Sequence, residues 1–117
     1  MHRVPIYHAV MREPTYFLLL SLTGGPLHGY AIAKRSGELS NGRVRLSAGT
    51  LYGALDRLVG TGELVIDREE IVEGRPRRYY RLTEHGTKQL HDETAALRTR
   101  LEVADRIIGP GLAVAGS

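Results

Sequence analysis

The sequence predicts a small, mainly α-helical domain that carries a β-hairpin and ends in a long helix. Three patterns favour this fold class: a helical apolar stripe over residues 48–59, two strand-like runs around the turn "EGRPR", and a heptad repeat over residues 90–108. The chain has 117 residues, 42% hydrophobic and 25% charged, which is typical of one folded domain. It has no cysteine, which excludes disulfides and thiolate metal sites, and no apolar run approaches the ~18 residues of a membrane span.

The first part of the chain predicts two helices and a short strand. Pro14 suits the first turn of a helix, and the apolar run that follows it ends at a Gly-Gly-Pro sequence. A second helix is expected over about 27–39, and a short alternating segment at 44–46 predicts one strand of a small sheet. Residues 1–12 show no periodicity and are interpreted as an N-terminal extension that docks on the domain or frays.

The third predicted helix, over residues 47–60, has the clearest periodicity. Ser47 is a good N-cap, and a Gly-Thr-Gly sequence ends the helix. The expected inward face consists of Ala48, Leu51, Leu55, Leu58 and Val59. The opposite face is almost free of side chains near the N-terminal half, where it consists of Gly49, Thr50, Gly53 and Ala54. Since each glycine disfavours a helix interior by roughly 1 kcal/mol relative to alanine, this face requires an explanation.

A helix surface with few side chains suits close approach to duplex DNA. The major groove is about 12 Å wide and admits one helix, and small residues let the helix backbone approach base edges and phosphates. The polar side chains that border this surface, and are expected to contact the DNA with it, are Ser47, Thr50, Tyr52 and Arg57. The alternative is that the two glycines permit close packing of another helix of the same domain.

The predicted hairpin combines two strand-like runs, over residues 63–72 and 77–82, with an arginine-rich turn. Residues 1–62 have a net charge of +4, whereas residues 63–82 are neutral in sum, but the arginines of this second segment gather at its turn. Arg75, Arg77 and Arg78 directly follow a helix-turn-helix pattern, so we interpret the hairpin as a wing that holds phosphates or enters a minor groove. The alternative is an ordinary solvated loop.

The last third of the chain predicts one long helix over residues 83–108, with Thr83 as its N-cap. Its heptad seam, flanked by charged residues, consists of Leu90, Thr94, Leu97, Leu101, Ala104 and Ile108. We expect the apolar members of this seam to contact a second copy in a two-fold homodimer, the alternative being that the helix packs back on its own domain. Residues 109–117 are small and are expected to form a flexible tail.

Four motifs, in this order, resemble the PadR family, regulators named for control of phenolic acid decarboxylase. They are "GPLHGYAI" at 25–32, "SAGTLYGALDRL" at 47–58, "GEL" at 62–64 and "GRPRRYYRLTEHG" at 74–86. The resemblance implies a winged helix-turn-helix DNA-binding domain over 13–82, with 47–60 as recognition helix, 68–78 as wing and 83–108 as dimerisation helix. It also implies transcriptional repression in bacteria, and the single helix after the wing is similar to the family's short-tailed members.

The resemblance also bears on two further sites. Tyr16 is interpreted either as a core aromatic residue or as a phosphate contact. Some members of the family sense small molecules near the dimer helices, and a hydrophobic effector in this chain would be lined by Phe17, Leu20, Leu97 and Leu101. The alternative is that these four residues are ordinary core.

Catalysis finds little support in these residues. The five histidines show no close metal-ligand spacing, and "SAGT" lacks the pattern of a nucleophile elbow, so we expect no enzyme, no metal site and no cofactor. We expect a cytoplasmic, homodimeric, sequence-specific regulator that binds double-stranded DNA at a palindromic operator. The competing hypothesis is a winged-helix module that binds a partner protein and no DNA.

Overall fold

A computed structural model describes residues 11–109, and within this range the chain forms four helices and one three-stranded antiparallel sheet. The helices are α1 (Glu13–Ser21), α2 (Gly29–Leu39), α3 (Ala48–Gly60) and α4 (Glu84–Ile108). The strands are β1 (Leu27–His28), β2 (Leu64–Val72) and β3 (Arg75–Leu82), in the order β1-β3-β2. The predicted fold class, mainly α-helical with a small β wing, is therefore confirmed. The expected extension and tail lie outside the described residues, apart from residues 11, 12 and 109.

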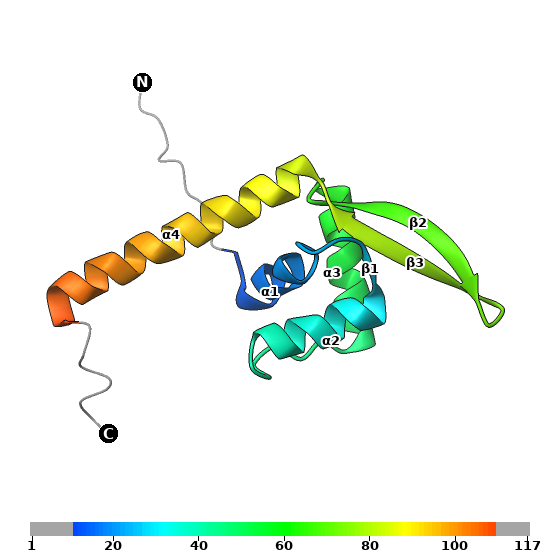
Figure 1. Cartoon of the computed structure of the whole chain (residues 1–117), viewed down its shortest axis with the longest axis horizontal. Coiled ribbons are helices and arrows are strands. Elements are labelled where there is room, and N and C mark those ends of the chain that lie inside the picture. The colour runs from blue at the N-terminus through cyan, green and yellow to red at the C-terminus, as the bar shows by residue number, and fades with distance from the viewer. Residues whose placement is uncertain (1–10, 110–117) are drawn as a thin grey trace.

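Helices α1, α2 and α3 form the body of the molecule, and two long elements leave it in opposite directions. Strands β2 and β3 project from one side as a wing, and the C-terminal half of α4 projects from the other (Figure 1). The base of the wing, the C-terminal end of α3 and the N-terminal end of α4 meet at one corner of the body. This arrangement leaves both long elements largely accessible to other molecules.

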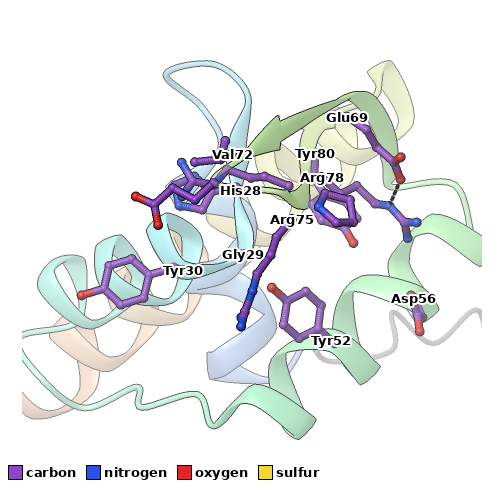
Figure 2. Close-up of a pocket in the computed structure, with 13 residues that line it drawn as sticks. His28, Gly29, Tyr30, Tyr52, Asp56, Glu69, Val72, Arg75, Arg78 and Tyr80 are labelled. Atoms are coloured by element: carbon purple, nitrogen blue, oxygen red, sulfur yellow. Dashed lines mark hydrogen bonds and ion pairs between the residues drawn. The ribbon is translucent and has the colours of Figure 1, made fainter.

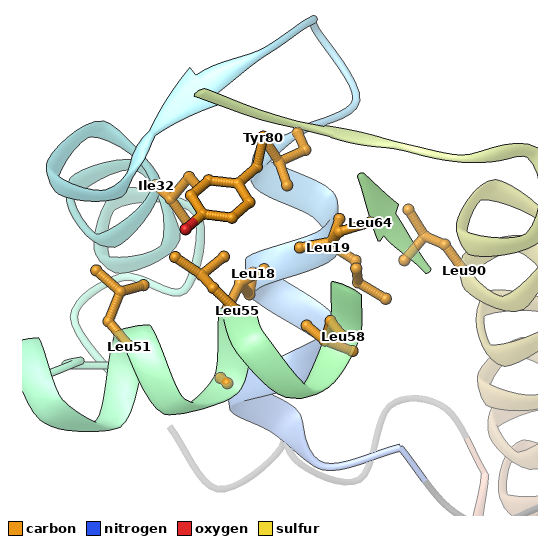
Figure 3. Packing of buried hydrophobic residues seen from close by; sticks show 11 residues of the cluster. Leu18, Leu19, Ile32, Leu51, Leu55, Leu58, Leu64, Tyr80 and Leu90 are labelled. Carbon is orange, nitrogen blue, oxygen red and sulfur yellow. The ribbon is translucent and has the colours of Figure 1, made fainter. Parts of the chain in front are cut away.

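One hydrophobic cluster joins all of these elements (Figure 3). Leu19 of α1, Ile32 of α2 and Leu55 of α3 are completely buried at its centre. The sheet contributes Tyr80, which is 2% exposed, and α4 contributes Leu90, which is 6% exposed. Helix α3 is therefore attached to the body along one face, which is the face its apolar periodicity predicts.

The inward face of α3 differs in detail from the sequence prediction. Its buried residues are Leu51, Ala54, Leu55 and Leu58, which follow the i, i+3, i+4, i+7 spacing of a helix stripe. Ala54, expected on the outer face, is buried, whereas Ala48, expected inside, is exposed. The stripe is centred on Leu55, and Ala48 at the first helical position lies outside it.

The third strand does not lie where the sequence predicts it. Residues 44–46 form no strand, because the backbone N–H of Val44 donates to Ser40 Oγ (2.9 Å) and its side chain is buried. The third strand is instead β1, which pairs with Tyr79 and Tyr80 of β3. Helix α2 consequently begins at Gly29, two residues later than expected.

The tip of the wing is tighter than predicted. Glu73 and Gly74 both have positive φ angles, 52° and 77°, and connect Val72 to Arg75 as a two-residue turn. Arg75, expected in the turn, therefore lies on β3 together with Arg77 and Arg78. Pro76 is tolerated within this strand because β1 pairs only with Tyr79 and Tyr80 and does not extend along it.

The central position of Leu55 makes it the most sensitive site of the body. Leu55→Ala should lower the free energy of unfolding by about 2–5 kcal/mol, because it removes buried apolar contacts and leaves a cavity. Urea unfolding at one fixed chain concentration measures the change. The control Ile71→Ala truncates a side chain that is 73% exposed, and should change the same quantity by less than about 1 kcal/mol. Equal effects of the two substitutions would contradict the packing described here.

Candidate nucleic-acid interface

The outer face of α3 is bare in the structure as well as in the sequence. Gly49, Thr50 and Gly53 are exposed, and a Cβ atom added at either glycine would meet no atom within 4 Å. Close packing of another helix of the same domain, the alternative explanation of these glycines, is therefore wrong. Ser47 caps the helix by accepting a hydrogen bond from the backbone N–H of Thr50 (3.3 Å).

This face of α3 borders an open cleft of about 1030 Å³ between α3, the start of α2 and the wing. In Figure 2, Tyr52 of α3 and Arg75 of β3 extend toward each other, whereas the ring of Tyr30 of α2, another lining residue, points away from them. Asp56 lies on the α3 side of the cleft and Glu69 on the wing side. Of the α3 residues predicted to contact DNA, Tyr52 lines this cleft, together with the three predicted wing arginines, Arg75, Arg77 and Arg78. The other α3 residues of that prediction do not line it.

The wing arginines differ in whether they have an acidic partner. Arg78 Nε donates to Glu69 Oε2 (2.9 Å), which raises the pKa of the guanidinium still further. Arg68, on β2, pairs with both Glu70 and Asp67 and lies 4.0 Å over the ring of Tyr79. In contrast, Arg75 and Arg77 form no ion pair within residues 11–109. Arg75 and Arg77 are thus the wing arginines without an ion pair in this range, although Arg77, opposite Glu70, adds to the lowering of the Glu70 pKa that is caused mainly by Arg68.

The start of α2 is a part of this surface that the sequence reasoning missed. Tyr52 of α3 lies against Gly29, and there is no room for a Cβ at that position. The neighbouring His28 ring contacts Tyr79 of the wing, with 5.5 Å between ring centres, and Tyr30 is 72% exposed. These residues belong to the motif "GPLHGYAI", but no local pattern in the sequence indicates that they lie beside α3 and the wing.

Three expected site residues lie elsewhere. The Tyr16 hydroxyl, considered as a phosphate contact, lies 2.8 Å from Thr94 Oγ1 and joins α1 to α4. Leu90, expected in the dimer seam, is buried in the core of its own domain, because the first turns of α4 pack on the body. Leu20, expected in an effector pocket, packs against the same core. Arg57 is exposed on α3, as expected.

A second, smaller cavity of about 290 Å³ lies between α1 and α4. Phe17 and Leu97, two of the four residues expected around an effector, line this cavity. Leu101, the remaining one, is 61% exposed and does not line it. The cavity also receives two carboxylates, Glu13 and Glu93, and is therefore less apolar than the sequence suggested.

The part of the chain that the structure describes has neither a membrane-spanning helix nor a metal-binding cluster. None of its helices is long and apolar enough to cross a membrane. Among residues 11–109, no group of three or more His, Asp or Glu residues is arranged to hold a metal ion.

A helix with a bare exposed face, preceded by a second helix and followed by a β wing, defines a winged helix-turn-helix, a class of DNA-binding domain. Residues 18–92 match the model of the transcriptional regulator PadR-like family, so the chain belongs to this family. Its members are DNA-binding regulators and not enzymes.

Individual relatives agree with this assignment. The chain is 39% identical over 80 residues to transcriptional regulator Rv3488 of Mycobacterium tuberculosis, covering 68% of this chain and 71% of that protein. A PadR family transcription regulator from Clostridium difficile has a similar structure, with a TM-score of 0.68, 26% identity and coverage of 84% of this chain and 100% of that one. The structure of Bacillus subtilis PadR in complex with operator DNA is also similar, with a TM-score of 0.62 and 28% sequence identity. The match covers 69% of this chain and 46% of that one. The chain thus spans about half the length of B. subtilis PadR.

The contact between His28 and the wing predicts a dependence of stability on pH. Burial, and to a smaller extent the nearby Arg77, hold the pKa of His28 below its usual 6.5. The unfolded chain therefore takes up this proton first, so stability should fall as pH drops below about 6.5 and through the lower pKa of the folded state. His28→Gln should reduce this slope in unfolding measurements between pH 7.5 and 5. The slope is the readout, because the substitution also removes the ring that contacts Tyr79; an unchanged slope would assign the pH dependence to other groups.

Proposed function

We propose that the chain is a homodimeric transcriptional regulator that binds a palindromic operator, with α3 in the major groove and the wing on the flanking DNA. The observation that carries the proposal is the open space outside Gly49 and Gly53. A helix backbone without side chains on its outer face approaches base edges more closely than an ordinary helix does. The operator DNA bound to B. subtilis PadR, a similar protein, supports the same kind of partner for this chain.

The residues proposed to contact DNA follow from what borders this space. On α3 they are Ser47, Gly49, Thr50, Tyr52, Gly53 and Arg57, and on the wing Arg75, Arg77 and Arg78. Tyr52 has a double role, because its ring is held against Gly29 while the residue remains 48% exposed. Arg75 and Arg77 supply charge for phosphates, whereas Arg78 is already partly neutralised by Glu69.

The proposed dimer uses the part of α4 that lies beyond the body. Leu101 and Ile108 are each 61% exposed, and Leu97 and Ala104 are partly buried. A two-fold axis between two such helices would present two copies of α3 to half-sites about one turn of DNA apart. Such a regulator acts on DNA in the cytoplasm of a bacterial cell, and repression follows when the bound dimer blocks access to a promoter.

A small hydrophobic effector remains part of the proposal, at the cavity beside Phe17 and Leu97. Its position between α1 and α4 lets a bound molecule change the angle between the dimer helix and the body. Titration of hydrophobic dyes into the purified protein, followed by measurement of operator release, tests this role. Binding without release would show that the cavity has no regulatory function.

The decisive experiment is a mobility-shift assay with duplex DNA that contains an inverted repeat from upstream of the protein's own gene. The proposed function expects a retained complex whose affinity falls steeply with added salt, because phosphate contacts release counterions. The competing hypothesis, a winged-helix module that binds a partner protein, expects no retained duplex even at low salt.

The bare face of α3 makes opposite predictions for folding and for binding. Gly53→Ala should raise the free energy of unfolding by up to about 1 kcal/mol, because alanine favours a helix and the site has free space. The added methyl group should keep α3 away from the groove and weaken operator binding by about tenfold, the effect of losing one good base contact. Gly60→Ala is the matched control, because Gly60 also faces open space but lies at the other end of α3. Equal binding by the two variants would remove Gly53 from the interface.

The unpaired wing arginines predict the salt dependence of binding. Replacing Arg75 and Arg77 by alanine should lower the slope of log affinity against log salt by about 2, one for each lost phosphate contact. The control Arg43→Ala/Arg68→Ala removes the same net charge, but from side chains already paired with Glu13 and with Asp67 and Glu70. An equal loss of slope in both double variants would indicate a general charge effect rather than a contact by the wing.

A further inference from the structure

Glu93 is an acidic side chain whose surroundings are incomplete in a single chain. It lies on α4, is 7% exposed, and forms no hydrogen bond or ion pair within residues 11–109. The small part of it that remains accessible borders the cavity between α1 and α4. The Glu93 carboxylate thus has no cation of its own protomer beside it within residues 11–109, and a cation that enters the cavity from another molecule can reach it.

The cavity is suited to the side chain of an arginine. Tyr16 and Phe17 of α1 and Leu97 of α4 provide aromatic and apolar walls around the acid. A guanidinium group favours aromatic faces and is the usual partner of a carboxylate at an interface. The volume of about 290 Å³ is at the lower end of the range for small-molecule sites and is sufficient for the end of one arginine side chain.

Arg100 of the same helix lines the same cavity without pairing with Glu93. The two residues are seven positions apart, which places them on one face of α4 at a distance of about 10 Å along the helix axis. Leu97 lies between them. An acid and a base placed in this way on one helix face form a self-complementary pattern. A two-fold axis that passes between them, perpendicular to the helix, places the acid of one copy opposite the base of the other.

We propose that two copies of α4 cross antiparallel near Leu97, so that Glu93 of each copy pairs with Arg100 of the other. Two reciprocal ion pairs then close the two cavities, and Leu97 of each copy lies at the centre of the contact. The surface is continuous with the exposed residues of α4 that follow it, such as Leu101. The inference rests on the proposed homodimer and specifies which surface forms it and in what register.

Exchange of the two charges between chains tests the proposal directly. Glu93→Arg gives a chain with two arginines at these positions, and Arg100→Glu gives a chain with two glutamates. Each variant alone should dimerise about tenfold more weakly than the unmodified chain in sedimentation experiments, because like charges then face each other. A 1:1 mixture should form the heterodimer in preference to either homodimer, measured by native mass spectrometry of chains with different tags. A pair formed within one chain could not produce this preference.

A matched control makes the same change of net charge as Arg100→Glu at another position of α4. Arg98→Glu also reverses an exposed arginine of α4, but Arg98 does not line the cavity, so its mixture with Glu93→Arg should show no preference for the heterodimer. Glu93→Gln, which keeps the size of the side chain, serves if Glu93→Arg does not fold by circular dichroism. The proposal expects Glu93→Gln to weaken the dimer, because the substitution removes the charge that pairs with Arg100 of the other copy. If no cation faced Glu93 in the dimer, removing its charge would instead strengthen the dimer.

The result separates this inference from the proposed function. Homodimers of Glu93→Arg and Arg100→Glu that are as stable as the unmodified dimer, together with normal operator binding, overturn the inference and leave the DNA-binding function in place. A loss of the Glu93→Gln effect when residues 1–10 are removed also overturns it, because the cation then comes from the N-terminal segment. A chain that stays monomeric at all concentrations overturns both the dimer and the register.

Discussion

The backbone at Gly62 and Glu63 is the point on which the arrangement of α3, the wing and α4 depends. The Glu63 N–H donates to the carbonyl of Leu58 in the last turn of α3 (3.0 Å), and the Glu63 carbonyl accepts from the N–H of Thr83 (3.0 Å). Thr83 Oγ1 in turn accepts from the N–H of Gly86 and so caps α4. Gly86 lies so close to the Glu63 carbonyl that a Cβ atom would overlap it. One short junction thus fixes α3, both wing strands and α4 relative to one another, as preorganised binding to a rigid duplex requires.

Beyond this junction the wing has no core beneath it, and its charges have a different role. The ion pairs of Glu69 with Arg78 and of Glu70 with Arg68 are exposed, and pairs of this kind contribute little to stability because water screens them. The strand ladder between β2 and β3 supplies most of the order of the wing. In the proposed complex with DNA, these pairs leave Arg75 and Arg77 as the wing arginines without an ion pair within residues 11–109.

Local patterns were predicted well from the sequence, and features that depend on distant partners were not. The stripe around Leu55 and the cap at Thr83 involve neighbours within one or two turns, so periodicity was enough to place α3 and α4. Strand β1 has two residues, and its partners on β3 are some fifty positions away, so nothing local marks it. Leu90 fits the heptad as well as Leu97 does, because a seam does not record where the body of the domain ends. The sequence also does not distinguish Gly53, whose surroundings are open, from Gly86, where the Glu63 backbone leaves no room for a side chain.

The bare face of α3 is physically possible only because its other face is so well buried. Two exposed glycines disfavour the helix by roughly 2 kcal/mol in total relative to alanine. Burial of Leu51, Leu55 and Leu58 contributes about 1.5–3 kcal/mol for each side chain, which exceeds this penalty. Helix α3 is therefore stabilised by the domain rather than by its own propensity, and its outer face is released from any role in folding. Alanine would be tolerated at Gly49 and Gly53 as far as the protomer is concerned, and the proposed close approach of α3 to DNA supplies a reason for these glycines that folding does not.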